Sequence, residues 1–350
     1  MSPPAREGSR PVEERRGAPA GPAAAPAWAA PALDSLLDRV AVTQAETGDR
    51  FPLYADPDTG TWQTTARGSW TGGFWAGLLW LRARCSGDGS DREAARSCTA
   101  RLADWAEADT ATRGLIFWYG TALADDDLGL RDRAARACLD AFDPELGLVP
   151  WGSAFGGPRL LARVDGVPGM VPLLATADAE AARSHLHRHL DLCLAARLPR
   201  WSWRHAPGAG WTACADPPPG WSRGPAWLLL AIAEAACLPG GDVFGEHVGR
   251  LLPEHLVPPA DAAHPGGPRD TSAAAVTALA LLRLGRRDRA VAVLAELVGR
   301  HLTADGRLLD GCYDLTAATA VRHELVWGDF FLAYALAELT GLVRCDAGQV

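Results

Sequence analysis

The sequence predicts an all-α protein whose helices close into a double ring, an (α/α)6 barrel. From Leu33 onward, segments of about 12 to 18 residues rich in Ala, Leu and Arg follow one another, separated by short turns of Gly, Pro and Asp. Helices that are apolar almost all round also alternate with helices that carry a charged face. Buried and charged helices would alternate similarly in a helical solenoid. The sequence of a solenoid should, however, repeat with a period of about 34 to 45 residues, and this sequence shows no such period.

The pattern predicts about twelve helices and no convincing series of strands. The most apolar segments should form the inner ring, and they span 71–85, 168–177, 223–237, 271–285 and 327–341. Charged faces place the segments 91–108, 179–196 and 287–301 in the outer ring. The other predicted helices span 32–47, 114–124, 130–142 and 242–252.

The first 30 residues are rich in Pro, Ala and charged residues and contain no run of Leu, Ile or Val. This composition is typical of a disordered tail, and the missing apolar run argues against a signal peptide. We therefore expect a tail over 1–30, a single barrel domain over 31–345 and a cytoplasmic protein. No apolar stretch approaches the roughly 18 to 20 residues of a membrane span.

The composition also narrows the class of partner. The chain of 350 residues has a net charge of −8, and its longest basic cluster is Arg15-Arg16, which argues against a nucleic-acid surface. Its eight cysteines are scattered, with no CxxC pair and no spacing of a zinc site. We expect mostly buried thiols, no metal, no cofactor and a small-molecule partner.

The segments that precede the predicted inner helices carry Gly, Trp, Arg and Asp: "ARGSWTGGFW", "DGVPGMVPLL", "GWSRGPAW", "GGPRDTSAAA" and "ELVWGDFF". In a closed ring these ends would meet at one mouth, where free N–H groups and helix dipoles favour an anionic ligand. Most tryptophans lie in or beside these segments, and indole faces suit sugar rings. An anionic small molecule or oligosaccharide is therefore the expected substrate.

Several blocks of the chain resemble, in the same order, those of glycoside hydrolase family 88, the unsaturated glucuronyl hydrolases. They are "GDRFP" (48–52), "WTGGFWAGLLWL" (70–81), "VPWGS" (149–153), "RVDGVPGMVPLL" (163–174), "WSRGPAW" (221–227), "RDTSAAAVTALALL" (269–282) and "VWGDFFLAYAL" (326–336). The resemblance covers about residues 33–341. It implies an (α/α)6 barrel with its site at the mouth.

The resemblance also implies a reaction on a 4,5-unsaturated uronic acid at the non-reducing end of an oligosaccharide. A carboxylic acid protonates C4 of the vinyl ether, water adds at C5, and the hemiketal opens with loss of the neighbouring sugar. The family's proton-transfer position falls on Asp165, which precedes the Pro-Leu-Leu block by one residue more than in the family. Taken without the resemblance, Asp165 would be a turn or helix-capping residue.

The family's second aspartate is absent from the matching segment, "ADTATRGLIFWYG". If Gly114 takes the place of the family's glycine, Thr112 replaces the Asp and Ala111 the His. Asp109 could substitute only in a rearranged loop. Because a lone carboxyl lacks the partner that tunes it, a changed substrate is plausible, such as a vinyl ether or unsaturated sugar of a specialised biosynthetic pathway.

Further positions match those with which the family walls its sugar pocket: Trp70, Trp151, Arg223 and Trp227. Arg223 could bind a carboxylate or could tie loops together. His205 falls where the family has a substrate-facing histidine. Trp75 is either a substrate contact or part of the helix core.

Two groups of polar residues have structural interpretations. Only His185 and His189 of the triplet that also contains His187 share a helix face, and no carboxylate stands at a ligand position, so a solvated helix face is expected. Asp270 and Asp329 are expected to cap inner helices. The sequence thus favours a family 88-like enzyme with Asp165 as acid and base. The alternatives are a catalytically silent carbohydrate-binding descendant and, third, a helical scaffold.

Overall fold

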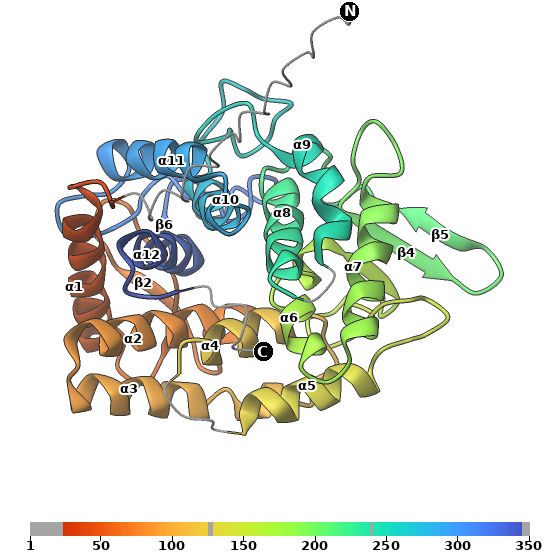
Figure 1. The fold of residues 1–350 in the computed structure, drawn as a ribbon, viewed down its shortest axis with the longest axis horizontal. Helices are drawn as coiled ribbons and strands as arrows, with labels where there is room; N and C mark the ends of the chain where they lie inside the picture. The colour runs from red at the N-terminus through yellow and green to blue at the C-terminus, as the bar shows by residue number, and fades with distance from the viewer. Residues whose placement is uncertain (1–23, 125–128, 239–240, 345–350) are drawn as a thin grey trace, which may run out of the picture.

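Helical segments close into an inner ring in the computed structural model, which describes residues 24–124, 129–238 and 241–344 (Figure 1). Each segment packs on the next, starting with α2 (Gly72–Ser86) on the π-helix η3 (Gly114–Trp118) and α4 (Tyr119–Thr121). The ring continues through α6 (Met170–Ala175), α8 (Arg223–Ala236), α10 (Thr271–Arg283) and α12 (Val326–Thr340). Because α12 packs back on α2, the chain is a closed ring and not an open solenoid.

An outer layer covers this ring. α1 (Ala29–Thr47) packs on α12 and α2, and α3 (Gly89–Ala100) packs on α2. α5 (Leu130–Asp140) and α7 (Ala179–Cys193) cover α6. The 3-10 helix η5 (Gly241–His247) and α9 (Val248–Leu251) cover α8, and α11 (Arg287–Arg300) covers α10. The predicted fold class, an (α/α)6 barrel, is confirmed.

The inner helices approach one another closely where they carry glycine. A Cβ atom on Gly73 would lie 2.3 Å from the carbonyl oxygens of Leu115 and Ile116, and one on Gly77 would lie 2.7 Å from that of Tyr119. Any larger residue at these positions would push α2 away from η3 and α4. The glycines of "WTGGFWAGLLWL" are therefore required by the packing of two adjacent inner helices.

Some predicted elements differ from the structure. The helix expected over 114–124 is a π-helix followed by one short α-turn, and the helix expected over 91–108 ends at Ala100, with a 3-10 turn, η2 (Ala103–Trp105), beyond it. Two three-stranded antiparallel sheets were not predicted. One has the order β2 (Trp62–Thr65), β1 (Phe51–Ala55), β6 (Glu324–Leu325), and the other β3 (Leu161–Arg163), β4 (Ser202–Ala206), β5 (Gly210–Ala213). Strands this short give too few alternations for a periodic signal.

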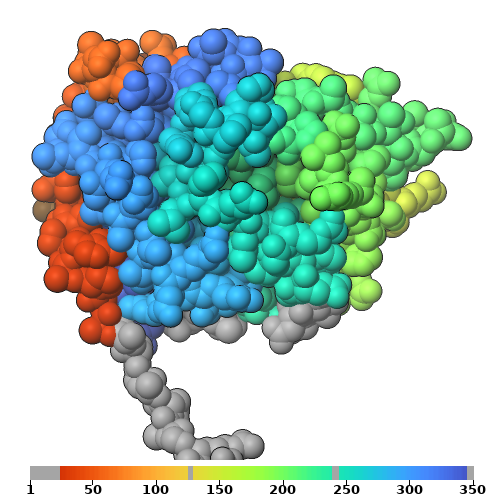
Figure 2. All heavy atoms as spheres, turned by 90° about the horizontal axis from the view of Figure 1, so that it is seen from above, coloured from red at the N-terminus to blue at the C-terminus, as the bar shows by residue number. Residues whose placement is uncertain are grey.

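The remaining sequence-based expectations concern the ends and the surface. Most of the predicted tail, residues 1–23, lies outside the described residues, and α1 begins at Ala29. The β4–β5 hairpin projects from the ring (Figure 1), and the segment after α9 crosses the face shown in Figure 2. None of the helices in the described ranges has the length and apolar character needed to cross a membrane. Cys98, Cys138, Cys193 and Cys312 are buried thiols.

Candidate active site

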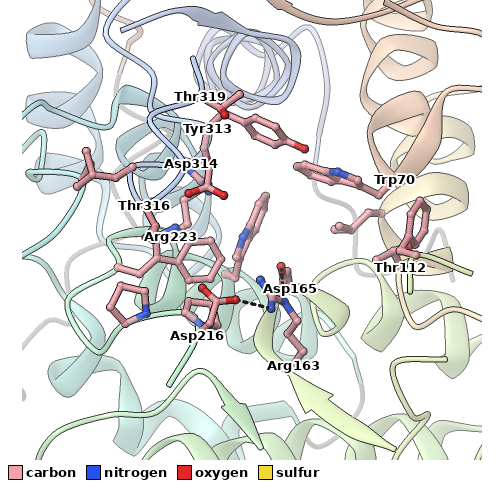
Figure 3. A pocket seen from close by; sticks show the side chains of 18 of the residues that line it. Trp70, Thr112, Arg163, Asp165, Asp216, Arg223, Tyr313, Asp314, Thr316 and Thr319 are labelled. Carbon is pink, nitrogen blue, oxygen red and sulfur yellow. Dashed lines mark hydrogen bonds and ion pairs between the residues drawn. The ribbon is translucent and has the colours of Figure 1, made fainter. Parts of the chain in front are cut away.

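The loops that lead into the inner helices surround one cavity of about 450 Å³ (Figure 3). The loops before α2, α6, α10 and α12, together with residues of η3 and α8, contribute to it, as expected if the helix starts meet at one mouth. Aromatic side chains form much of the wall, namely Trp70, Trp151, Phe155, Trp221, Trp227 and Tyr313. The charged residues of the lining are Arg163, Asp165, Asp216, Arg223, Asp261 and Asp314. An aromatic wall with a few convergent polar groups is typical of a sugar-binding or catalytic pocket.

Trp70 is aimed into the cavity by a tight turn. Gly68 and Ser69 both have left-handed backbones, with φ of 83° and 51°, and lead into the 3-10 helix η1 (Ser69–Thr71). The indole of Trp70 then stacks on Tyr313, with ring centres 6.4 Å apart and planes at 15°. This pair joins the start of α2 to the loop before α12. A left-handed serine beside a pocket is the kind of backbone strain that occurs at functional sites.

Asp165 lies in the 3-10 turn η4 (Val164–Gly166) that follows β3. Its carboxylate accepts hydrogen bonds from Nε of Arg163 at 2.9 and 3.1 Å, and its side chain keeps 20% of its surface exposed. The N-cap of α6 is Gly169 and no side chain caps it, so Asp165 is not the helix cap that its local sequence suggested. Its carboxylate faces the cavity instead (Figure 3).

Arg163 links two carboxylates and an aromatic wall. Its Nη1 lies 3.4 Å from Oδ2 of Asp216, and its guanidinium carbon lies 5.4 Å from the centre of the Trp151 ring. The charge of Asp165 is the main cause that raises the pKa of Arg163 above its ordinary value. Asp165, Arg163 and Asp216 therefore form one charged chain along the cavity.

Thr112 lines the same cavity but offers no charge. It is 2% exposed, and its hydroxyl lies 2.9 Å from that of Thr110. Asp109 does not line the cavity. Its carboxylate accepts hydrogen bonds from the backbone N–H and hydroxyl of Ser153 and from Nε of Arg159, at 3.0 to 3.1 Å. The loop is thus not rearranged to bring Asp109 in place of Thr112.

Arg223 lies at the start of α8, and its guanidinium is already bound by the protein. It donates to Oδ2 of Asp270 at 2.8 Å, to the carbonyl of Cys312, and to the carbonyl of Tyr313 at 2.5 Å. Only 7% of its side chain is exposed. Of the two sequence-based interpretations of Arg223, the structure favours the arginine that ties loops together.

No protein-family model matches the chain. An unsaturated glucuronyl hydrolase from Bacillus sp. (strain GL1) is 25% identical over 367 residues, which cover 88% of this chain and 96% of the relative. The chain is related to the unsaturated glucuronyl hydrolases.

Solved structures of this group share the fold. An unsaturated glucuronyl hydrolase specific for heparin has a TM-score of 0.78 at 20% identity, over 91% of this chain and 99% of its own. An Asp-to-Asn variant bound to dGlcA-Glc-Rha-Glc has a TM-score of 0.75 at 22% identity, over 88% and 96%. These likenesses support the predicted barrel along nearly its whole length.

Two residues predicted to contact the substrate, Trp75 and His205, do not line the cavity. Trp75 is 2% exposed and lines a narrow crevice with Leu36 and Val40 of α1, because that side of α2 faces the outer ring. His205 packs on Trp211 with ring centres 5.1 Å apart. It follows Arg204, which lines a neighbouring surface groove, and successive strand residues point to opposite faces. We therefore leave Trp75 and His205 out of the proposed site.

The sequence-based expectation of a solvated face for the α7 histidines is wrong. Two of these histidines are buried behind the cavity, and one of them hydrogen-bonds the loops that line it. His185 and His189 are fully buried, and only His187 is exposed, where it pairs with Asp191 at 3.2 Å. Nδ1 of His185 accepts from the N–H of Val149 at 3.1 Å, and Nε2 donates to the carbonyl of Gly166 at 3.3 Å. The described residues contain no group of side chains that could hold a metal.

The two expected helix caps differ in outcome. Asp270 is the N-cap of α10 and accepts from the N–H of Ser272 at 3.1 Å. Asp329 is no cap, because the N-cap of α12 is Leu325. The Asp329 carboxyl accepts instead from the N–H of Leu308 at 3.3 Å, and burial raises its pKa well above the ordinary value.

Sequence reasoning missed several cavity residues: Arg163, Asp216, Tyr313 and Asp314. Arg163 lies two positions before Asp165, so proximity in the sequence was a usable signal. Asp216 and Asp314 come from irregular loops, where nothing in the sequence indicates which way a side chain points.

Proposed function

We propose that this protein is a hydrolase that hydrates the vinyl ether of a 4,5-unsaturated uronic-acid glycoside or of a related unsaturated sugar. The observation that carries the proposal is the carboxylate of Asp165, which faces an aromatic-walled cavity at the mouth of the barrel. Support comes from the related unsaturated glucuronyl hydrolases, one of which is solved with a bound oligosaccharide. The cavity of about 450 Å³ has room for a sugar ring.

In the proposed reaction the protonated carboxyl of Asp165 gives its proton to C4 of the double bond. The charge that develops at C5 is shared with the ring oxygen, and water adds at C5 as its proton passes to the Asp165 carboxylate. The hemiketal then opens and the neighbouring sugar leaves with its oxygen. When Asp165 carries the proton, Arg163 retains Asp216 as an acceptor, at 3.4 Å. Trp70 and Trp151 would hold the sugar ring in place.

A specific observation favours a second candidate, a catalytically silent carbohydrate-binding protein. The position that matches the family's second aspartate holds the neutral Thr112, and Asp165 is bound by a guanidinium rather than by another carboxyl. Under this candidate the aromatic mouth would bind sugars without turnover.

Incubation with unsaturated uronyl disaccharides and their neutral derivatives separates the two candidates. Consumption of the conjugated double bond removes its ultraviolet absorbance. We expect a time-dependent loss with the native protein and a loss at least a hundredfold slower with Asp165→Asn, because the amide cannot transfer the proton. Glu254→Gln, an exposed carboxyl that lines none of the described cavities, is the control and should keep the native rate. Binding of the same sugars without loss of absorbance would instead establish the silent candidate.

A further inference from the structure

The described lining of the cavity contains more carboxylates than guanidiniums. Asp165, Asp216, Asp261 and Asp314 face Arg163 and Arg223. A substrate that brings its own carboxylate would add another negative charge to this set. It would need a cation that is not already bound by the protein.

Neither arginine is such a cation. Arg163 uses Nε on both oxygens of Asp165 and turns Nη1 to Asp216, so a carboxylate contacts it even when Asp165 carries the proton. Arg223 is bound to the buried Asp270 and to two carbonyls, with 7% of its side chain exposed. Removing either from its partners would leave a buried or half-buried carboxylate unpaired.

The starts of two inner helices, α10 and α6, already meet carboxylates of the protein. The N-terminal N–H groups of α10 are bound by the carboxylate of Asp270. The N–H of Gly169, the N-cap of α6, donates to Oε2 of the buried Glu234 at 2.8 Å. At these two helix starts, N–H groups of the kind that led us to expect an anionic ligand already donate to the protein's own carboxylates.

Two carboxylates remain available at the opening. The side chain of Asp216 is 77% exposed and has its Arg163 contact at 3.4 Å, and Asp314 is exposed, with one oxygen accepting from the N–H of Ala317 at 2.9 Å. Figure 3 shows both on the same side of the cavity as Arg223. Both charges repel an anion that enters past them.

We propose that the unsaturated sugar taken by this site is uncharged at C6, the position at which a uronate carries its carboxylate. This inference rests on the proposed function and specifies its substrate class: a 4,5-unsaturated sugar with an amide, ester or hydroxymethyl group on C5. The aromatic wall then supplies the binding energy, and no buried charge has to be compensated.

A matched pair of probes tests the proposal. The 4,5-unsaturated uronyl disaccharide and its C6 primary amide have almost the same shape and differ in one charge. We expect the amide to be favoured at pH 7 at least tenfold in kcat/KM, and in Kd measured by tryptophan fluorescence. The preference should shrink as salt is raised, because screening weakens repulsion between partly exposed charges.

Variants locate the cause. Asp216→Asn and Asp314→Asn each remove one negative charge from the opening and should each narrow the preference for the amide severalfold, mainly by improving binding of the acid. Glu254→Gln removes an exposed carboxyl that lines none of the described cavities and should leave the ratio unchanged.

Different results would contradict the uncharged substrate class and the hydrolase function. Absorbance loss or binding that favours the acid, or treats acid and amide alike, overturns the uncharged substrate. Binding that favours the amide while neither compound loses absorbance upholds the charge selectivity and overturns the hydrolase function. Binding of neither compound overturns both claims.

Discussion

At the scale of single residues, the character of the site depends on the partners of Asp165. The carboxylate is held by Arg163, which also contacts Asp216, and Thr112 lines the same cavity without a charge. A carboxyl that shares a site with another carboxyl retains a proton more readily. A second carboxyl in the cavity lining is therefore the change that tests proton donation by Asp165.

Replacing Thr112 tests that argument. Thr112→Asp would put another carboxyl, at a position 2% exposed, in the lining of the cavity that Asp165 faces. We expect kcat on the uncharged unsaturated disaccharide to rise about tenfold. Thr112→Asn, which has the same shape without the charge, is the control. Equal rates for the Asp and Asn variants would show that the missing carboxyl does not limit turnover.

At the scale of elements, α7 supports the cavity through its buried histidines. His185 bridges Val149, in the loop that carries Trp151, and Gly166, in the turn that carries Asp165. His189 supports His185 by donating from Nδ1 to its carbonyl at 2.8 Å. Sequence periodicity placed these histidines on one helix face but not against the mouth loops, because α7 is covered by loops distant in sequence.

The buried histidines make folding stability depend on pH. Burial lowers the pKa of His189 from 6.5 to about 4, so the folded protein resists a proton that the unfolded chain accepts. Stability from this group is complete above pH 6.5 and is lost as pH falls toward 4, by about 3 kcal/mol. In urea denaturation at pH 7 and pH 4.5, His189→Gln, which keeps a donor, should lose less stability than the native protein. An equal loss in both would contradict the assignment to His189.

At the scale of the whole molecule, the sequence was sufficient for the ring and only partly sufficient for its mouth. The all-round apolar character of α2 and α12 predicted inner helices, and both are buried on nearly every side. The break of the predicted 114–124 helix was not predictable from periodicity. A Cβ on Gly114 would lie 2.1 Å from the backbone nitrogen of Met170, so the start of η3 is set by a contact with a segment more than fifty residues away in sequence.

In the cavity, too, some features were predictable from the sequence and others were not. Trp70, Trp151, Asp165 and Trp227 were predicted from the resemblance to glycoside hydrolase family 88, and all four line the cavity. The charge balance was not predictable, since it depends on which carboxylates occupy the arginines and helix N–H groups. Such pairings join loops distant in sequence and leave no local pattern.

The proposed function depends on delivery of a proton to C4 of an unsaturated sugar, followed by addition of water at C5. The most direct measurement is the reaction of the native protein with the C6 amide disaccharide in D₂O. NMR is then recorded of the product that carried the double bond. We expect the double bond to disappear and one deuterium to appear at C4. Release of the neighbouring sugar with the double bond intact, or recovery of the disaccharide unchanged, would contradict it.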